Sequence, residues 1–94
     1  MNVLVEFTGV ARVLAGTQSV SLDLQDRVSF QDIVQHLGAT YPVLVGQVIQ
    51  PDGRTLYPSN FFNLNGKRML KPTQMHESPQ NGDHIVVMSI LAGG

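Results

Sequence analysis

The sequence predicts one α+β domain, a mixed β-sheet with one main helix packed across one face. Three observations indicate this class: strand-like alternation near the start, a helical apolar stripe in residues 29–41, and an Asn-Gly turn before a strongly apolar final run. With 94 residues, 43% apolar and 14% charged, the chain is long enough for a single domain spanning 1–94 and too apolar for a disordered one.

The first strand is predicted at residues 3–8. Its inward residues are Val3, Val5 and Phe7, and its outward residues are Leu4, Glu6 and Thr8. Residues 9–16 are interpreted as a turn region closed by a glycine. The second strand then presents an apolar face made of Val20, Leu22 and Leu24. We expect these two strands to form a hairpin.

The helix is marked by an apolar stripe at i, i+3, i+4 and i+7, made of Phe30, Ile33, Val34 and Leu37. Ser29 is suited to cap the first turn, and Asp32 stands three residues later, as in a capping box. Val28 is expected to pack on Ile33 as a hydrophobic staple. Gly38 and Pro42 indicate the end of the helix.

The second half contains the remaining strands. Residues 43–60 are a loop or a small edge hairpin, and Asn65-Gly66 predicts a type I′ turn between residues 61–64 and 67–70. After a loop at residues 71–80, the apolar run at 85–90 has the character of a central strand covered on both faces, parallel to the first strand. The predicted core is Val5, Phe7, Leu22, Phe30, Ile33, Val34, Leu37, Phe62, Leu64, Ile85 and Val87.

Composition excludes several functions. The net charge is −1 and the charged residues are scattered, so no surface for nucleic acid is indicated. No apolar run approaches the roughly 20 residues of a membrane span, and no signal peptide precedes the first strand, so a cytoplasmic location is expected. The absence of cysteine removes thiol nucleophiles and thiolate metal sites. The three histidines lack the spacing of metal ligands, so no metal site is predicted.

The last residues, 91–94, form a short tail after the final strand, and the tail ends in Gly93 and Gly94. If the strand ends near Leu91, the three extended residues after it carry the terminal carboxylate about 10 Å from the fold. Glycine, which has no Cβ, permits a partner's backbone to approach closely. A carboxylate is a poor electrophile, but adenylation by a partner enzyme would let its carbonyl carbon accept a nucleophile. The sequence therefore predicts a functional tail.

The whole chain resembles the MoaD/ThiS family of ubiquitin-like sulfur carriers, which have the β-grasp fold. The resemblance is carried by the single capped helix, Asn65-Gly66, Asn81-Gly82-Asp83 before the last strand, and the terminal Gly93-Gly94, together with Phe7, Ala11-Arg12 and the segment from Leu14 to Gly16. Family members that serve molybdopterin synthesis usually have a Pro-Pro pair before the final glycines. Here Ala92 precedes them, as in thiamin-type and cysteine-type carriers.

The resemblance implies that Gly94 is adenylated by an E1-like enzyme of the MoeB/ThiF type and converted to a thiocarboxylate, with Gly93 threading the tail. ATP and Mg would be used by that partner, and no cofactor would be bound by this chain. A sulfurtransferase would supply sulfur, an acceptor synthase would receive it, and the chain would be a carrier without catalysis of its own. The alternatives are a protein modifier conjugated to lysines through Gly94 and a purely structural interaction domain.

Candidate partner-binding residues are those that alternation turns outward, together with Arg12, which matches the arginine after strand one in that family. They are Leu4, Thr8, Arg12, Arg68, Val86 and Met88. An exposed apolar group at the root of the tail would be a docking patch, because the single helix covers only one sheet face. For Arg12, a solvated side chain whose stem covers the edge of the core is an equal alternative.

Overall fold

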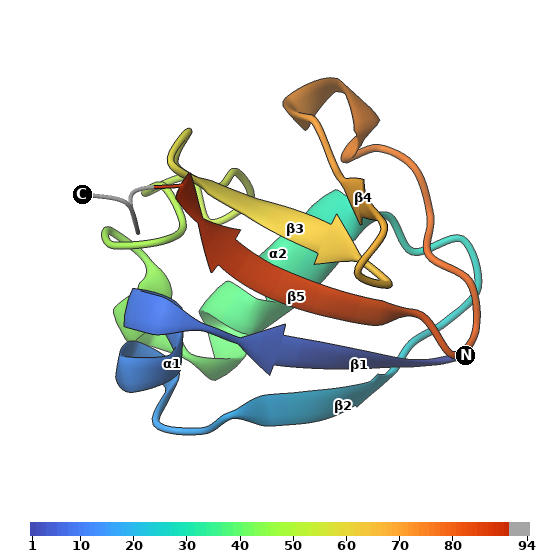
Figure 1. Ribbon diagram of the computed structural model, residues 1–94, viewed down its shortest axis with the longest axis horizontal. Helices are drawn as coiled ribbons and strands as arrows, with labels where there is room; N and C mark the ends of the chain where they lie inside the picture. The colour runs from blue at the N-terminus through green and yellow to red at the C-terminus, as the bar shows by residue number, and fades with distance from the viewer. Residues whose placement is uncertain (91–94) are drawn as a thin grey trace.

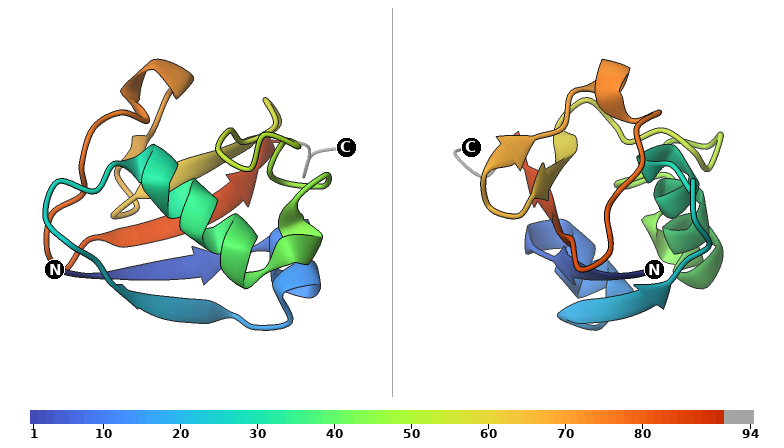
Figure 2. Two further views of the ribbon diagram at one scale, coloured as in Figure 1. Left: turned by 180° about the vertical axis from the view of Figure 1, so that it is seen from behind. Right: turned by 90° about the vertical axis from the view of Figure 1, so that its right-hand side faces the viewer.

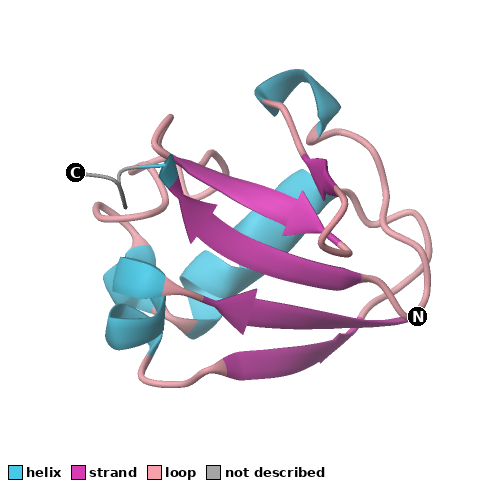
Figure 3. Cartoon of the chain, viewed as in Figure 1, coloured by secondary structure: helices cyan, strands magenta, loops and turns pink. Residues whose placement is uncertain are grey.

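The fold is built on a mixed sheet with the strand order β2-β1-β5-β3-β4, seen in the computed structural model, which describes residues 1–90 (Figure 1). The strands are β1 (Asn2–Phe7), β2 (Ser19–Asp23), β3 (Asn60–Leu64), β4 (Arg68–Met69) and β5 (His84–Ser89). The helices are α1 (Gly9–Ala15) and α2 (Phe30–Thr40), with short 3₁₀ turns η1 (Pro42–Leu44) and η2 (Pro72–Gln74). The predicted α+β class is confirmed (Figure 3).

The first and last strands are neighbours in the middle of the sheet. Strands β1 and β5 are parallel, with Val5 opposite Ile85, so the predicted parallel pair is confirmed. Strand β1 also pairs antiparallel with β2, and β5 with β3. The expectation that β5 is covered on both faces is wrong. Ile85 and Val87 are buried under α2, whereas Met88 is exposed on the other side, where no described helix crosses the strands (Figures 1 and 2).

Helix α2 begins as the sequence predicts. The Ser29 hydroxyl accepts a hydrogen bond from the Asp32 backbone N–H, and the Asp32 carboxylate accepts one from the Ser29 backbone N–H, each at 3.0 Å. This capping box satisfies donors that a helix start leaves free. The helix ends at Thr40, between Gly38 and Pro42, as the sequence predicts. Gly38 also serves packing, since a Cβ there would stand 3.3 Å from Val45 Cγ2.

The segment after β1 is a helix, and its interpretation as a turn region is wrong. Helix α1 spans Gly9–Ala15 and ends at Gly16, whose φ of 72° lies in the left-handed region. Gly16 N–H donates to the Arg12 carbonyl at 3.1 Å, which closes the last turn. Ala11 is the residue of α1 buried in the core. One small buried side chain gives no periodic signal, so the sequence pattern did not indicate the helix.

The Asn65-Gly66 turn is confirmed. Both residues have positive φ, 58° and 70°, and Lys67 N–H donates to the Leu64 carbonyl at 3.0 Å. These are the features of a type I′ hairpin turn. The strand that follows, β4, is only two residues long, because η2 begins at Pro72.

The core lies between the sheet and α2. Ten of the eleven predicted core residues are buried, and Leu64 is only half-buried. Val3, predicted to face inward, is buried as well. The buried residues that were not predicted are Ala11, Leu44, Val48, Ile49 and Leu70. Three of them come from the stretch after α2, which forms isolated bridges at Ile49 with Val45 and Leu56. Part of this stretch therefore contributes side chains to the core, so it is more than a loop or a small edge hairpin.

Candidate functional site

The outward side of the sheet carries an apolar surface that we call the open face. Its apolar members are Leu4, Phe61, Met69, Val86 and Met88, and its polar members are Glu6, Asn63 and His84. Strand alternation places them together, because the residues between them, such as Val5, Phe62 and Val87, are buried on the α2 side. Figure 1 views the sheet from this side. Exposed apolar side chains gathered on one face of a sheet are typical of a docking site.

Three predicted partner-binding residues lie on the open face. Leu4 and Met88 are 38% and 37% exposed, and Val86 between them is half-buried. Val86 pairs with Glu6 on one side and with Asn63 on the other, and Met88 pairs with Phe61. The structure therefore brings Leu4, Val86 and Met88 onto one surface across the neighbouring strands β1 and β5.

The other three predicted residues do not belong to this surface. Thr8 is the N-cap of α1, and its hydroxyl donates to the Val87 carbonyl at 2.5 Å, so it links β5 to the start of α1. Arg12 is exposed on α1, at the end of the sheet.

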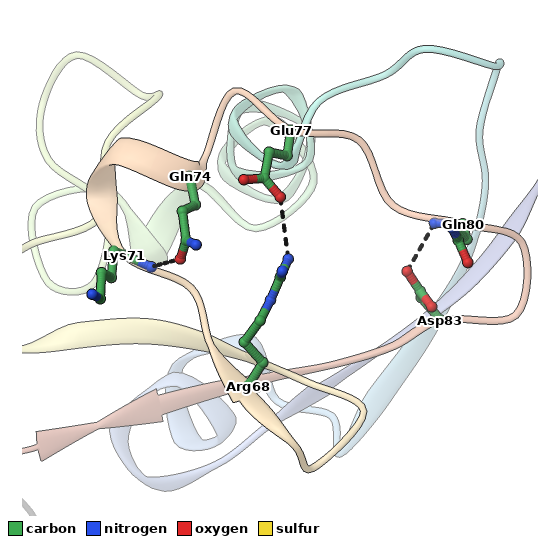
Figure 4. A network of polar contacts seen from close by, with 6 residues as sticks. All are labelled: Arg68, Lys71, Gln74, Glu77, Gln80 and Asp83. Atoms are coloured by element: carbon green, nitrogen blue, oxygen red, sulfur yellow. Dashed lines mark hydrogen bonds and ion pairs between the residues drawn. The ribbon is translucent and has the colours of Figure 1, made fainter.

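Arg68 was predicted to face outward, and this is wrong. It pairs with Leu64, which shares the parity of buried Phe62, and it reaches Glu77 at 3.2 Å beside the start of α2 (Figure 4). Both side chains are partly exposed, at 47% and 40%, and pairs at the surface contribute on the order of 0–1 kcal/mol.

Sequence reasoning missed two apolar members of the open face, Phe61 and Met69. Phe61 was read only as part of an apolar hairpin arm, yet it stands next to buried Phe62 and must point the other way. Met69 is 50% exposed and pairs with Asn63, which places it on the same side. The inward prediction for Phe62 was the available signal, because its neighbour Phe61 in the strand must then face outward.

A polar contact between two side chains crosses the open face. His84 Nε2 lies 2.9 Å from Glu6 Oε1, and both side chains are about one third to two fifths exposed. The contact is an ion pair only when the imidazole is protonated, and otherwise it is a hydrogen bond. It joins β1 to β5 next to Val86, so it gives the otherwise apolar surface a polar centre. The two residues are 78 positions apart, so no local pattern in the sequence indicates this contact.

The root of the tail is fixed by the sheet. Strand β5 ends at Ser89, and Ile90 N–H donates to the Ser59 carbonyl at 2.9 Å. Ile90 is 64% exposed, which continues the apolar surface from Met88 toward the tail. Gly93 and Gly94 lie outside the described residues.

No metal site emerges from residues 1–90, where no three His, Cys, Asp or Glu side chains are grouped to hold an ion. In the same residues no helix has the length and apolar character needed to cross a bilayer.

Solved structures give the relevant comparison, because no protein-family model and no curated protein matches the chain. SAMP1 from Haloferax volcanii aligns with a TM-score of 0.83 at 21% identity, over 100% of both chains. The chain has the ubiquitin-like β-grasp fold. Urm1 from Trypanosoma brucei aligns with a TM-score of 0.69 at 26% identity, over 99% of this chain and 95% of that one.

A third β-grasp structure is a putative molybdopterin converting factor, subunit 1, from Pyrococcus furiosus. It aligns with a TM-score of 0.72 at 18% identity, over 95% of this chain and 97% of that one. These neighbours confirm the fold of the MoaD/ThiS family that the sequence predicted. The general class of ubiquitin-like carriers and modifiers is supported by the likeness to Urm1, which extends over nearly the whole of both β-grasp chains.

Proposed function

We propose that this protein is a sulfur carrier whose Gly94 carboxylate is activated by an E1-like adenylating enzyme. The observation that carries the proposal is the position of Gly93 and Gly94 four and five residues after Ser89, the end of the middle strand of a ubiquitin-like fold. The open face adds a docking surface beside the root of that tail. This chain would then supply the docking surface and the Gly94 carboxylate, and partner enzymes would carry out adenylation and sulfur transfer.

The proposed chemistry uses no side chain of this protein. The Gly94 carboxylate attacks the α-phosphate of ATP on the partner enzyme, pyrophosphate leaves, and an acyl-adenylate forms. The terminal sulfur of a persulfide on the sulfurtransferase then attacks the carbonyl carbon and displaces AMP, which gives an acyl disulfide. A second thiol of the donor attacks the donor's own sulfur in that bond, so a disulfide forms on the donor and a thiocarboxylate is left on Gly94. The adenylating enzyme binds ATP and Mg. A sulfurtransferase supplies the sulfur, and an acceptor synthase receives it from the thiocarboxylate. This chain needs no cofactor of its own for any of these steps.

A second function starts from the same activated Gly94. A lysine amine in place of the sulfur nucleophile would give an isopeptide, as expected of a protein modifier. The likeness to SAMP1, a small archaeal modifier protein, keeps this candidate alongside the first. The two functions share the adenylation step and differ only in the nucleophile that follows.

Intact mass spectrometry separates these functions. The purified chain is incubated with ATP, a sulfur source and native extract. Replacement of one oxygen by one sulfur supports the carrier, and a set of conjugates of higher mass supports the modifier. An unchanged mass under conditions that activate a known carrier would remove both and leave a structural interaction domain.

A matched set of tail variants tests whether Gly94 is the activated group. One added residue moves the carboxylate by roughly 3.5 Å and puts an amide in its place, whereas reacting atoms must meet at about 3–3.5 Å. Deletion of Gly94 shortens the reach by the same amount. Both variants should keep the wild-type unfolding temperature and lose ATP–pyrophosphate exchange by the partner enzyme. Exchange at the wild-type rate with the extended chain would show that the Gly94 carboxylate is not activated.

A further inference from the structure

A groove with a volume of about 450 Å³ lies at the β4 edge of the sheet, and we call it the β4 groove. One wall comes from residues 54–58 and the other from residues 69–75, with Phe61 and Ile90 also lining it. The volume falls within the range of about 300–1,000 Å³ that is usual for ligand sites. Neither the tail nor the open face explains this feature, because most of its lining comes from the two loops.

The walls of the β4 groove are mainly apolar. Both loops contribute large apolar side chains to it: Leu56, Tyr57, Pro58, Met69, Leu70 and Met75. Met69 is 50% exposed, so much of its side chain is available to an occupant. An occupant therefore needs an apolar group of its own to bury here.

The charged residues of the β4 groove are all cationic. They are Arg54 and Lys71, and no Asp or Glu lines it. Arg54 donates to Gln31 Oε1 at 3.3 Å and lies near the carboxylates of Asp32 and Asp52, so part of its charge is compensated. Lys71 forms no ion pair within residues 1–90, and Figure 4 shows its side chain projecting from the start of η2, away from the Arg68–Glu77 pair. Charge complementarity therefore favours a negatively charged occupant.

The position of the groove favours a protein segment as this occupant. Leu70 N–H donates to the Phe62 carbonyl, so by antiparallel alternation the N–H and C=O of Met69 point to the free edge of β4. An extended peptide can use such edge groups and place side chains in an adjoining pocket. The groove also continues into the open face through Phe61 and Met69, so a partner docked on that face has a direct path into it.

We propose that the β4 groove binds an extended segment of a partner protein in which an apolar side chain stands next to Asp or Glu. The apolar side chain fills the space between the two loops, and the carboxylate meets Lys71. The proposal does not depend on activation of Gly94, because binding is measured on the chain alone.

The test is selection of short random peptides on the immobilised full chain, followed by titration of a synthesised winner by fluorescence anisotropy. The test variant is Lys71→Glu. The matched control is Lys67→Glu, which makes the same charge change in the exposed hairpin turn, outside the groove. We expect winners that combine an apolar residue with Asp or Glu. Lys71→Glu should weaken their binding at least about fivefold, Lys67→Glu less than twofold, and rising salt should weaken the wild-type complex. Amide NMR shifts should map to residues 54–58 and 69–75.

Other outcomes overturn the proposal. Winners without acidic residues, or equal losses for the two lysine variants, would remove Lys71 as the recognition group. Shifts confined to the open face would leave that face as the only docking surface. If the selected peptide binds about tenfold more tightly to a chain cut after Ile90, residues 91–94 are the natural occupant of the groove. If the chain self-associates and Lys71→Glu abolishes this, the occupant is a second copy of the chain. Thermal unfolding of each variant checks that the fold is retained.

Discussion

Met88→Lys is expected to weaken association with the adenylating enzyme while the fold is retained. Full burial of a Met side chain stabilises by about 1.5–3 kcal/mol, and Met88 is 37% exposed in the free chain. A partner that covers the remaining third therefore gains about 0.5–1 kcal/mol. An ammonium group forced into that contact adds a desolvation cost of at least about 1 kcal/mol. The sum, about 1.5–2 kcal/mol, corresponds to a ten- to thirtyfold increase in Kd.

The assay is titration calorimetry of wild-type and variant chains against the adenylating enzyme. The matched control is Val43→Lys, because Val43 is also exposed, at 51%, but lies on η1, away from the open face. The Lys stem can lie along the same apolar surface as the Met side chain, so both variants should unfold close to the wild-type temperature. If Met88→Lys and Val43→Lys bind within twofold of wild type, the open face is not the docking surface.

Three further predictions concern the fold. Ser29→Ala removes one bond of the capping box and should lower the free energy of unfolding by about 1 kcal/mol, measured by urea denaturation; an unchanged midpoint would mean that water replaces the cap. Hydrogen bonds from the Ser29 backbone N–H and side chain lower the pKa of Asp32 below its usual 3.8, so its stabilisation is present at neutral pH and lost as the pH falls through the lowered pKa. The stability gap between wild type and Asp32→Asn should therefore close in acid, and a constant gap from pH 7 to 2 would contradict this. In Gly66→Ala the added Cβ meets no atom within 4 Å, but the residue must hold a φ of 70°. Calorimetry should therefore show that the free energy of unfolding falls by about 1 kcal/mol from backbone strain alone. An unchanged free energy of unfolding would show that the turn relaxes.

Local signals in the sequence predicted most of the fold. The α2 stripe, its capping box and the Asn65-Gly66 turn depend on neighbours within a few residues, so they are visible without tertiary contacts. Helix α1 was missed because it begins at a glycine, carries two exposed valines and buries only Ala11. Its stability comes from packing at the end of the sheet, which no local pattern records.

The buried stretch after α2 packs closely against Gly38, near the end of that helix. Gly38 looks like a helix stop in the sequence, but it is a close contact point for Val45 and Ile49, which have no periodic pattern. For the site, alternation correctly placed Leu4, Val86 and Met88 on one face. It failed for Arg68, because the register of the short β4 is set by the hairpin turn and not by an apolar pattern. The roles of Gly93 and Gly94 stay predictions.

The place of β5 in the sheet has a mechanical consequence. A partner that draws the residues after Ile90 into a channel pulls on the middle strand, which is bonded to β1 on one side and to β3 on the other. A pull directed along β5 would load both ladders in shear, so many hydrogen bonds would have to break together before β5 slides. Traction on this terminus would therefore be transmitted to the whole domain, and the chain could be gripped and released by its end without unravelling.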